Sequence, residues 1–139
     1  MRNFASVLVV VASLCLLITL ILAWCLVGVR SSPFMKRLFP NYQYLLKAHI
    51  DYLLMTGLLM IFFLLFNHFH VSPPPIVVFT MSLGSFMNPV GFIALAIRPT
   101  LRQHPASPFG AIMAGSFTST TIGYAAAAWS IGHAALRSL

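Results

Sequence analysis

The chain has 139 residues, of which 60% are hydrophobic and only 6% are charged, and its formal net charge is +7. A soluble domain carries roughly 25% charged residues, so this composition excludes an ordinary water-soluble fold and indicates a polytopic membrane protein. The positive charge reflects a scarcity of acids, because the eight Lys and Arg residues are scattered along the chain. Nucleic-acid binding needs clustered basic residues and is not expected.

The first apolar run covers about residues 4–29. It is longer than the roughly 7–15-residue apolar core of a signal peptide, and no A-x-A cleavage site follows it. We therefore predict a retained helix. Cys15 and Cys25 lie in this run without metal-ligand partners nearby, and we interpret them as small packing residues.

Three further apolar runs follow, at about residues 45–66, 76–97 and 108–136. Each is long enough to cross a hydrocarbon core about 30 Å thick at roughly 1.5 Å per residue. Three prolines at 73–75 end one turn and begin the next helix. Because backbone polar groups must be satisfied internally in lipid, we predict an all-α fold, a polytopic membrane four-helix bundle that forms one domain over residues 1–139.

The basic residues predict an orientation. The first and third connectors hold six of them, whereas the opposite side holds two. The six are Arg30, Lys36, Arg37, Lys47, Arg98 and Arg102, and the two are Arg2 and Arg137. The positive-inside rule then puts the first and third connectors in the cytoplasm and both termini outside.

The second run opens with His49 and with Asp51, the only carboxylate side chain in the chain. On a helix His49 shares a face with Tyr52, Thr56 and Met60, whereas Asp51 lies about 200° away. The imidazole and the carboxylate therefore do not form a dyad within one protomer. Placing an ionisable group at membrane depth costs free energy, so each such residue is a candidate for a functional role.

Two interpretations of each group remain open. Asp51 either pairs with Lys47 one turn earlier, near the positive end of the helix dipole, or contacts another helix or protomer. His49 is either an interfacial histidine at headgroup depth or an axial ligand of haem iron. Neutral imidazole suits iron, and a membrane supplies the apolar surroundings that haem needs.

The third run carries a strip of small residues with one amide on a single helical face. Gly84, Ser85, Asn88 and Gly91 share this face, and Pro89 removes a backbone hydrogen bond and frees a carbonyl. Either the helix kinks and Asn88 satisfies the freed groups, or the strip is a flat wall with one hydrogen-bond donor aimed into a pocket.

The fourth run repeats a small residue every four positions. The repeat consists of Ala111, Gly115, Ser119, Gly123 and Ala127. Such a small-x-x-x-small stripe lets another helix approach closely. We therefore predict that this stripe lies at a helix–helix contact and that the helix is buried among protein.

The segment KAHIDYLLMTGLLM, followed by MNPVGF, resembles the small integral-membrane isomerases, styrene oxide isomerase and hydroxylaminobenzene mutase. In that family a basic residue and Ala-His open the second of four helices, and the third helix carries an Asn-Val-Gly-Phe-type motif. The matching residues here are Lys47-Ala48-His49 and Asn88-Pro89-Val90-Gly91-Phe92. The resemblance covers roughly residues 45–95, with a matching helix count and chain size.

The resemblance implies a haem b held between the protomers of a homotrimer, with His49 as the axial ligand of its iron. In the epoxide isomerase the ferric iron acts as a Lewis acid on the epoxide oxygen, and a hydride shift gives the aldehyde without redox turnover. We therefore predict an isomerase of a small aromatic or apolar substrate in the bacterial inner membrane. The predicted catalytic residues are Asn88, Tyr52 and Thr56, and the predicted cofactor contacts besides His49 are Ser85 and Gly91.

Two positions depart from the family pattern. Met55 stands where the family has an Asn six residues after the histidine, and Ile93 stands where the epoxide isomerase has a tyrosine. Epoxide isomerisation itself is therefore expected to be weak or altered, with Tyr52 or Tyr124 as a replacement hydroxyl. One alternative is a haem- or quinone-binding electron-transfer protein, for which His133 would be the second ligand. Another is a non-catalytic membrane scaffold.

Overall fold

A computed structural model of the chain describes residues 4–103 and 107–138. Within these ranges it contains helices and no strand, so the all-α prediction is confirmed. The elements are α1 (Ser6–Ser31), α2 (Pro33–Leu38), α3 (Tyr42–His68), α4 (Pro75–Ile97), the 3₁₀ helix η1 (Pro99–Gln103) and α5 (Pro108–Leu136).

The four long helices match the four predicted apolar runs to within three residues at each end. Two short helices, α2 and η1, were not predicted and lie inside the predicted connectors. With six residues in α2 and five in η1, these helices are too short to show an apolar periodicity.

Specific residues fix where the helices begin. The Asn41 side chain accepts a hydrogen bond from the backbone N–H of Tyr44 at 3.2 Å, and the Ser107 hydroxyl accepts one from Gly110 at 3.1 Å. Each bond satisfies a backbone donor that the first helical turn leaves free. Proline, whose missing N–H is harmless in the first turn, begins three α-helices, at Pro33, Pro75 and Pro108.

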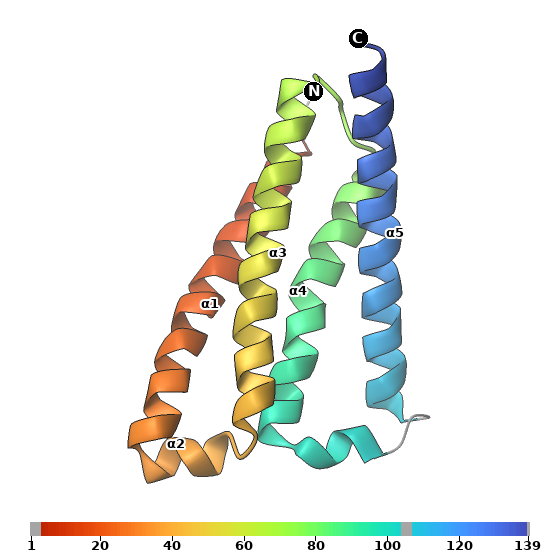
Figure 1. The fold of residues 1–139 in the computed structure, drawn as a ribbon. Helices are drawn as coiled ribbons and strands as arrows, with labels where there is room; N and C mark the ends of the chain where they lie inside the picture. Colours follow the sequence, from red (N-terminus) through yellow and green to blue (C-terminus); the bar gives the residue numbers. More distant parts are fainter. Residues whose placement is uncertain (1–3, 104–106, 139) are drawn as a thin grey trace.

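The long helices pack in chain order, α1 on α3, α3 on α4 and α4 on α5. The N- and C-terminal ends of the chain lie at one end of the molecule, and α2 and η1 lie at the other (Figure 1). α5 packs mainly on α4 and touches α3 at few positions. The expectation that α5 is buried among protein is wrong within one chain, because its buried residues are only Ser116, Gly123, Ala127 and Ile131.

Three helices, α1, α3 and α4, are long and apolar enough to cross a membrane. In their most apolar windows only 28%, 22% and 33% of the residues are buried within the chain. Large apolar side chains of these helices therefore point outward, including Trp24 of α1 at 78% exposure and Ile76 of α4 at 64%. Such extensive exposed apolar surface is consistent with contact with a lipid bilayer.

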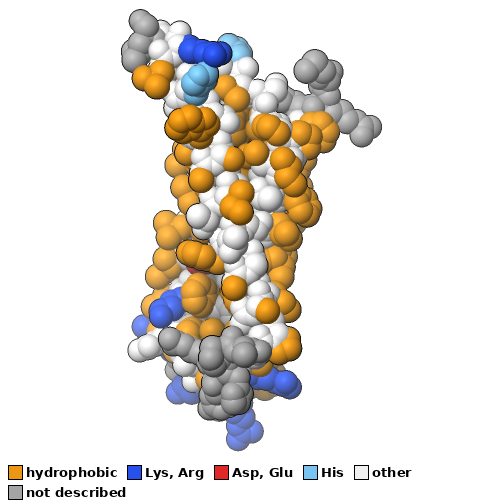
Figure 2. Space-filling model, turned by 90° about the vertical axis from the view of Figure 1, so that its right-hand side faces the viewer, with side chains coloured by type: hydrophobic (Ala, Val, Ile, Leu, Met, Phe, Trp, Pro, Cys, Tyr) orange, Lys and Arg blue, Asp and Glu red, His pale blue; other side chains and the backbone are white. Residues whose placement is uncertain are grey.

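The face over α5 shows the same pattern (Figure 2). Hydrophobic side chains run along most of its length, and Lys and Arg side chains gather toward the end where α2 and η1 lie. α5 itself is not one of the three candidate spans, and it is rich in Ala, Gly, Ser and Thr. It nevertheless carries no charged residue between Pro108 and Leu136.

Glycines set the distance between α4 and α5. A Cβ added at Gly84 would lie 2.7 Å from the backbone of Thr120, and one added at Gly123 would lie 2.7 Å from the backbone N of Met81. A Cβ at Gly115 would meet nothing within 4 Å. The predicted small-residue stripe is therefore a helix contact at Gly123 but not at Gly115, which is exposed and faces away from α4.

Gly84→Ala should lower the free energy of unfolding by about 1–3 kcal/mol, because the added methyl group overpacks the contact with Thr120. The matched control, Gly115→Ala, should not destabilise the protein, since Ala is the better helix former and the site is open. Thermal unfolding of the purified protein in detergent measures both changes. Equal effects of the two substitutions would contradict the α4–α5 contact at Gly84.

Candidate functional site

His49 faces α1. Its Nδ1 atom lies 3.1 Å from the backbone oxygen of Thr19, a buried residue of α1. A carbonyl oxygen only accepts hydrogen bonds, so Nδ1 carries the proton in this contact. In the neutral ring the lone pair is then on Nε2, for which the described residues provide no hydrogen-bond partner.

The surface beside His49 is apolar. Leu46, one turn before the histidine, is 36% exposed, and Leu53, one turn after it, is 50% exposed. His49 itself is half-buried. The imidazole therefore lies in an outward apolar surface of α3, with one nitrogen fixed by α1.

Tyr52 and Thr56, two of the predicted catalytic residues, donate their hydroxyl protons to backbone carbonyls. The Tyr52 hydroxyl bonds the Phe86 oxygen at 3.1 Å, in the turn of α4 before Pro89. The Thr56 hydroxyl bonds the Tyr52 oxygen at 2.8 Å and lies 3.5 Å from the oxygen of Ala12. The Tyr52 hydroxyl therefore joins α3 to α4, whereas the short bond of the Thr56 hydroxyl stays within α3.

Asn88, the third predicted catalytic residue, joins α4 to α5. Its Nδ2 donates to the Thr120 hydroxyl at 3.0 Å, and its Oδ1 accepts from the Ser116 hydroxyl at 2.9 Å. The amide therefore bonds side chains of α5, and the interpretation that it satisfies groups freed by Pro89 is wrong. The alternative, a flat wall with one hydrogen-bond donor aimed into a pocket, agrees in part, because Asn88 lines the cavity described below but its Nδ2 donates to Thr120.

The two predicted cofactor contacts also lie between α4 and α5. The Ser85 hydroxyl and the Tyr124 hydroxyl are 2.8 Å apart and share a hydrogen bond. Gly91 lies under the side chain of Met113, which leaves no space for a Cβ. Within one chain, therefore, neither Ser85 nor Gly91 lies with His49, which faces α1.

Asp51 faces the opposite side of α3 from His49, as the helical periodicity predicts. It lines a cavity of about 560 Å³ on the side of α4 and α5. The other lining residues are Met55, Asn88, Phe92, Met113, Ala114, Phe117 and Thr120. Sequence reasoning did not assign this cavity. Asp51 and Met55 share a helical face, but the sequence does not show which residues of α4 and α5 lie opposite.

The expected pair between Asp51 and Lys47 is not formed. The Lys47 Nζ atom lies over the ring of Tyr44, 5.5 Å from its centroid. Among the described residues, the Asp51 carboxylate has no hydrogen bond or ion pair.

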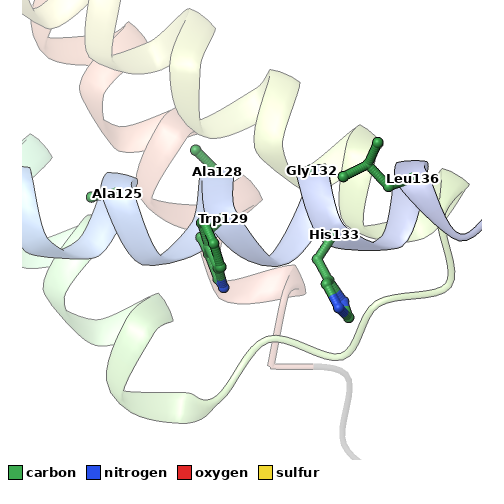
Figure 3. Close-up of a pocket in the computed structure, with 6 residues that line it drawn as sticks. All are labelled: Ala125, Ala128, Trp129, Gly132, His133 and Leu136. Atoms are coloured by element: carbon green, nitrogen blue, oxygen red, sulfur yellow. The ribbon is translucent and has the colours of Figure 1, made fainter.

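His133 lies at the other end of the molecule from His49. It lines a cavity of about 560 Å³ near the C-terminal end of α5, where Trp129 and His133 point to the same side of the helix (Figure 3). His49 lies near the beginning of α3, at the end where α2 lies (Figure 1). Within one chain the two histidines therefore cannot ligate one haem from opposite faces.

The other potential ligands do not assemble a metal site of their own. Cys15 and Cys25 are free thiols, as interpreted from the sequence. In the part of the chain that the structure describes, no three His, Cys, Asp or Glu residues come together. A comparison with family models, curated proteins and solved structures finds no match for this chain.

Tyr52→Phe should lower the free energy of unfolding by about 0.5–1.5 kcal/mol, because it removes a buried hydrogen bond between α3 and α4. Tyr42→Phe is the matched control, since the Tyr42 hydroxyl accepts only a long, exposed bond of 3.3 Å from Arg30. Thermal unfolding of the detergent-solubilised variants measures both changes in the free energy of unfolding. A smaller loss for Tyr52→Phe than for the control would contradict this bond.

Proposed function

We propose that the chain is a membrane-embedded, haem b-dependent isomerase of a small aromatic or apolar substrate, with His49 as the iron ligand. The observation that supports this most is the bond between His49 Nδ1–H and the Thr19 carbonyl. Metal-ligating histidines usually donate the second ring N–H to a carbonyl or carboxylate, which fixes the tautomer and orients the ring. His49 has this support, and its Nε2 is left for a metal.

The residues around His49 fit a haem in two respects. A single imidazole is a sufficient protein ligand when the macrocycle supplies the other nitrogens. The exposed side chains of Leu46 and Leu53 offer apolar contact to a flat macrocycle. Because this surface faces outward, we infer that a neighbouring protomer covers the other haem face, as in the homotrimer implied by the family resemblance.

Haem iron would supply a Lewis acid for the oxygen of an epoxide or a hydroxylamine. His49 would ligate the iron, and the backbone carbonyl of Thr19 would fix the orientation of the imidazole ring. Asn88 lies on the opposite side of its own chain from His49, so an orienting contact from Asn88 to the substrate would come from an adjacent protomer. Tyr52 and Thr56 would then act on the site through packing, since their protons are bound to carbonyls.

We further propose that α5 crosses the membrane with α1, α3 and α4, which gives four spans in a bacterial inner membrane. The helix has 29 residues, or roughly 44 Å at 1.5 Å per residue. Several of its hydroxyls bond its own backbone one turn earlier, for example Thr120 to Ser116 and Thr121 to Phe117. Such bonds lower the cost of placing hydroxyls in lipid.

Cysteine labelling tests the number of crossings in a background with Cys15→Ala and Cys25→Ala. Ser72→Cys and Ser138→Cys should react with an impermeant reagent added outside, whereas Ser32→Cys should not. Labelling of the Ser138 position only from the cytoplasm would mean that α5 does not cross. Reversal of all three patterns would overturn the orientation and leave four crossings.

Haem ligation is tested by the visible spectrum of protein produced with ample haem. The wild type should show a Soret band, and His49→Ala should lose or strongly shift it because the ligand nitrogen is gone. His133→Ala, at the far end of α5, should retain it. Absence of haem from the wild type would refute both the cofactor and the isomerase proposals.

The same preparation tests the reaction. Aryl epoxides and arylhydroxylamines should isomerise without added reductant, and turnover on styrene oxide should be low because Met55 and Ile93 replace the family's residues. A haem protein that works only after reduction would instead be an electron-transfer protein.

A further inference from the structure

Asp51 lines an apolar cavity and has no partner among the residues that the structure describes. It lies nine residues after Tyr42, the first residue of α3, or roughly 14 Å along the helix axis. Among the described residues it has no ion pair or hydrogen bond. An unpaired ionised carboxylate away from water costs several kcal/mol, so a cation in the cavity would remove much of this cost.

The other polar groups of the cavity are already engaged. Asn88 donates to Thr120 and accepts from Ser116, and the Thr120 hydroxyl donates to the Ser116 backbone oxygen at 2.9 Å. Among the described residues on the wall, the Asp51 carboxylate is the one charged group. A ligand that pairs with it must therefore bring hydrogen-bond donors and positive charge.

The remaining wall excludes a bare metal ion as the preferred occupant. It consists of Met55, Phe92, Met113, Ala114 and Phe117, whereas hard cations need several oxygen ligands. An organic cation suits both parts of the site, because its apolar body contacts these side chains. Phe117 also offers an exposed ring, and aromatic faces attract ammonium groups.

We propose that the cavity lined by Asp51, Asn88 and Phe117 binds a small organic cation, a protonated amine with an aromatic or aliphatic body. The ammonium group pairs with Asp51, and the body fills the space between α3 and α5. The cavity volume of about 560 Å³ falls within the range of small-molecule sites, roughly 300–1,000 Å³. Within one chain this site is on the opposite side of α3 from His49, so the pairing of an ammonium group with Asp51 needs no haem bound to that histidine.

A second cavity suggests the route of entry. It has about 340 Å³, is lined by Lys47 and Tyr44, and shares Phe92 and Met113 with the Asp51 cavity. The two cavities therefore adjoin along the groove between α3 and α5. Lys47 lies nearer the helix end, so its charge opposes the entry of a cation, and its removal should favour binding.

Calorimetric titration of the purified wild type with 2-phenylethylamine and with 2-phenylethanol tests the proposal at neutral pH. The two compounds have nearly the same size, but only the amine is charged, since alkylamines ionise near a pKa of about 10. The amine should bind at least tenfold more tightly than the alcohol. Equal affinities would overturn the proposal, and this comparison requires no variant.

Three variants locate the charge that is recognised. Asp51→Asn should abolish the preference for the amine, whereas Lys47→Met should retain or strengthen it. His49→Ala should keep the amine site even if haem is lost, which separates this proposal from the proposed isomerase. The proposal of an amine site at Asp51 would be refuted if the preference for the amine survived in Asp51→Asn. It would also be refuted if the amine bound only to haem, seen as a shift of the Soret band. Loss of the oligomer in Asp51→Asn together with no amine binding to the wild type would instead assign Asp51 to a contact between protomers.

Discussion

The close contact of α4 with α5 at Gly84 and Gly123 determines where the polar groups of this chain lie. Without a Cβ at these positions the two backbones approach closely, and Asn88 reaches the hydroxyls of Ser116 and Thr120. In surroundings without water such bonds have no competitor, so they fix one arrangement of the helices. With α5 held on α4 and making little contact with α3, a space remains beside Asp51.

α3 separates two chemically different surfaces. On one side His49 bonds α1 and presents Nε2 among exposed leucines; on the other, Asp51 faces an apolar cavity shared with α4 and α5. The difference follows from two residues of spacing, which is about 200° of rotation on a helix. Because the helix stands between them, a ligand at one surface does not compete for space with a ligand at the other.

The sequence predicted the long helices closely, because apolar length and flanking prolines mark them directly. It also predicted that His49 and Asp51 point in opposite directions. It did not predict the partners of Asn88 and Tyr52, which are Thr120 and Phe86, more than thirty residues away. Periodicity identifies the face of a helix but not which neighbour covers it, and for the same reason Gly115 was expected at a helix contact that Gly123 makes and Gly115 does not.

The modest hydropathy of α5 bears on how the chain enters a membrane. Ala, Gly, Ser and Thr make this helix a weaker insertion signal than α1, α3 or α4, and its hydroxyls gain most when Thr80 and Asn88 of α4 are beside them. Under the proposed fourth crossing, α4 and α5 would enter the bilayer together as a helical hairpin, because the more apolar α4 offsets the cost of inserting α5. Insertion of α5 would then depend on α4, which is synthesised just before it.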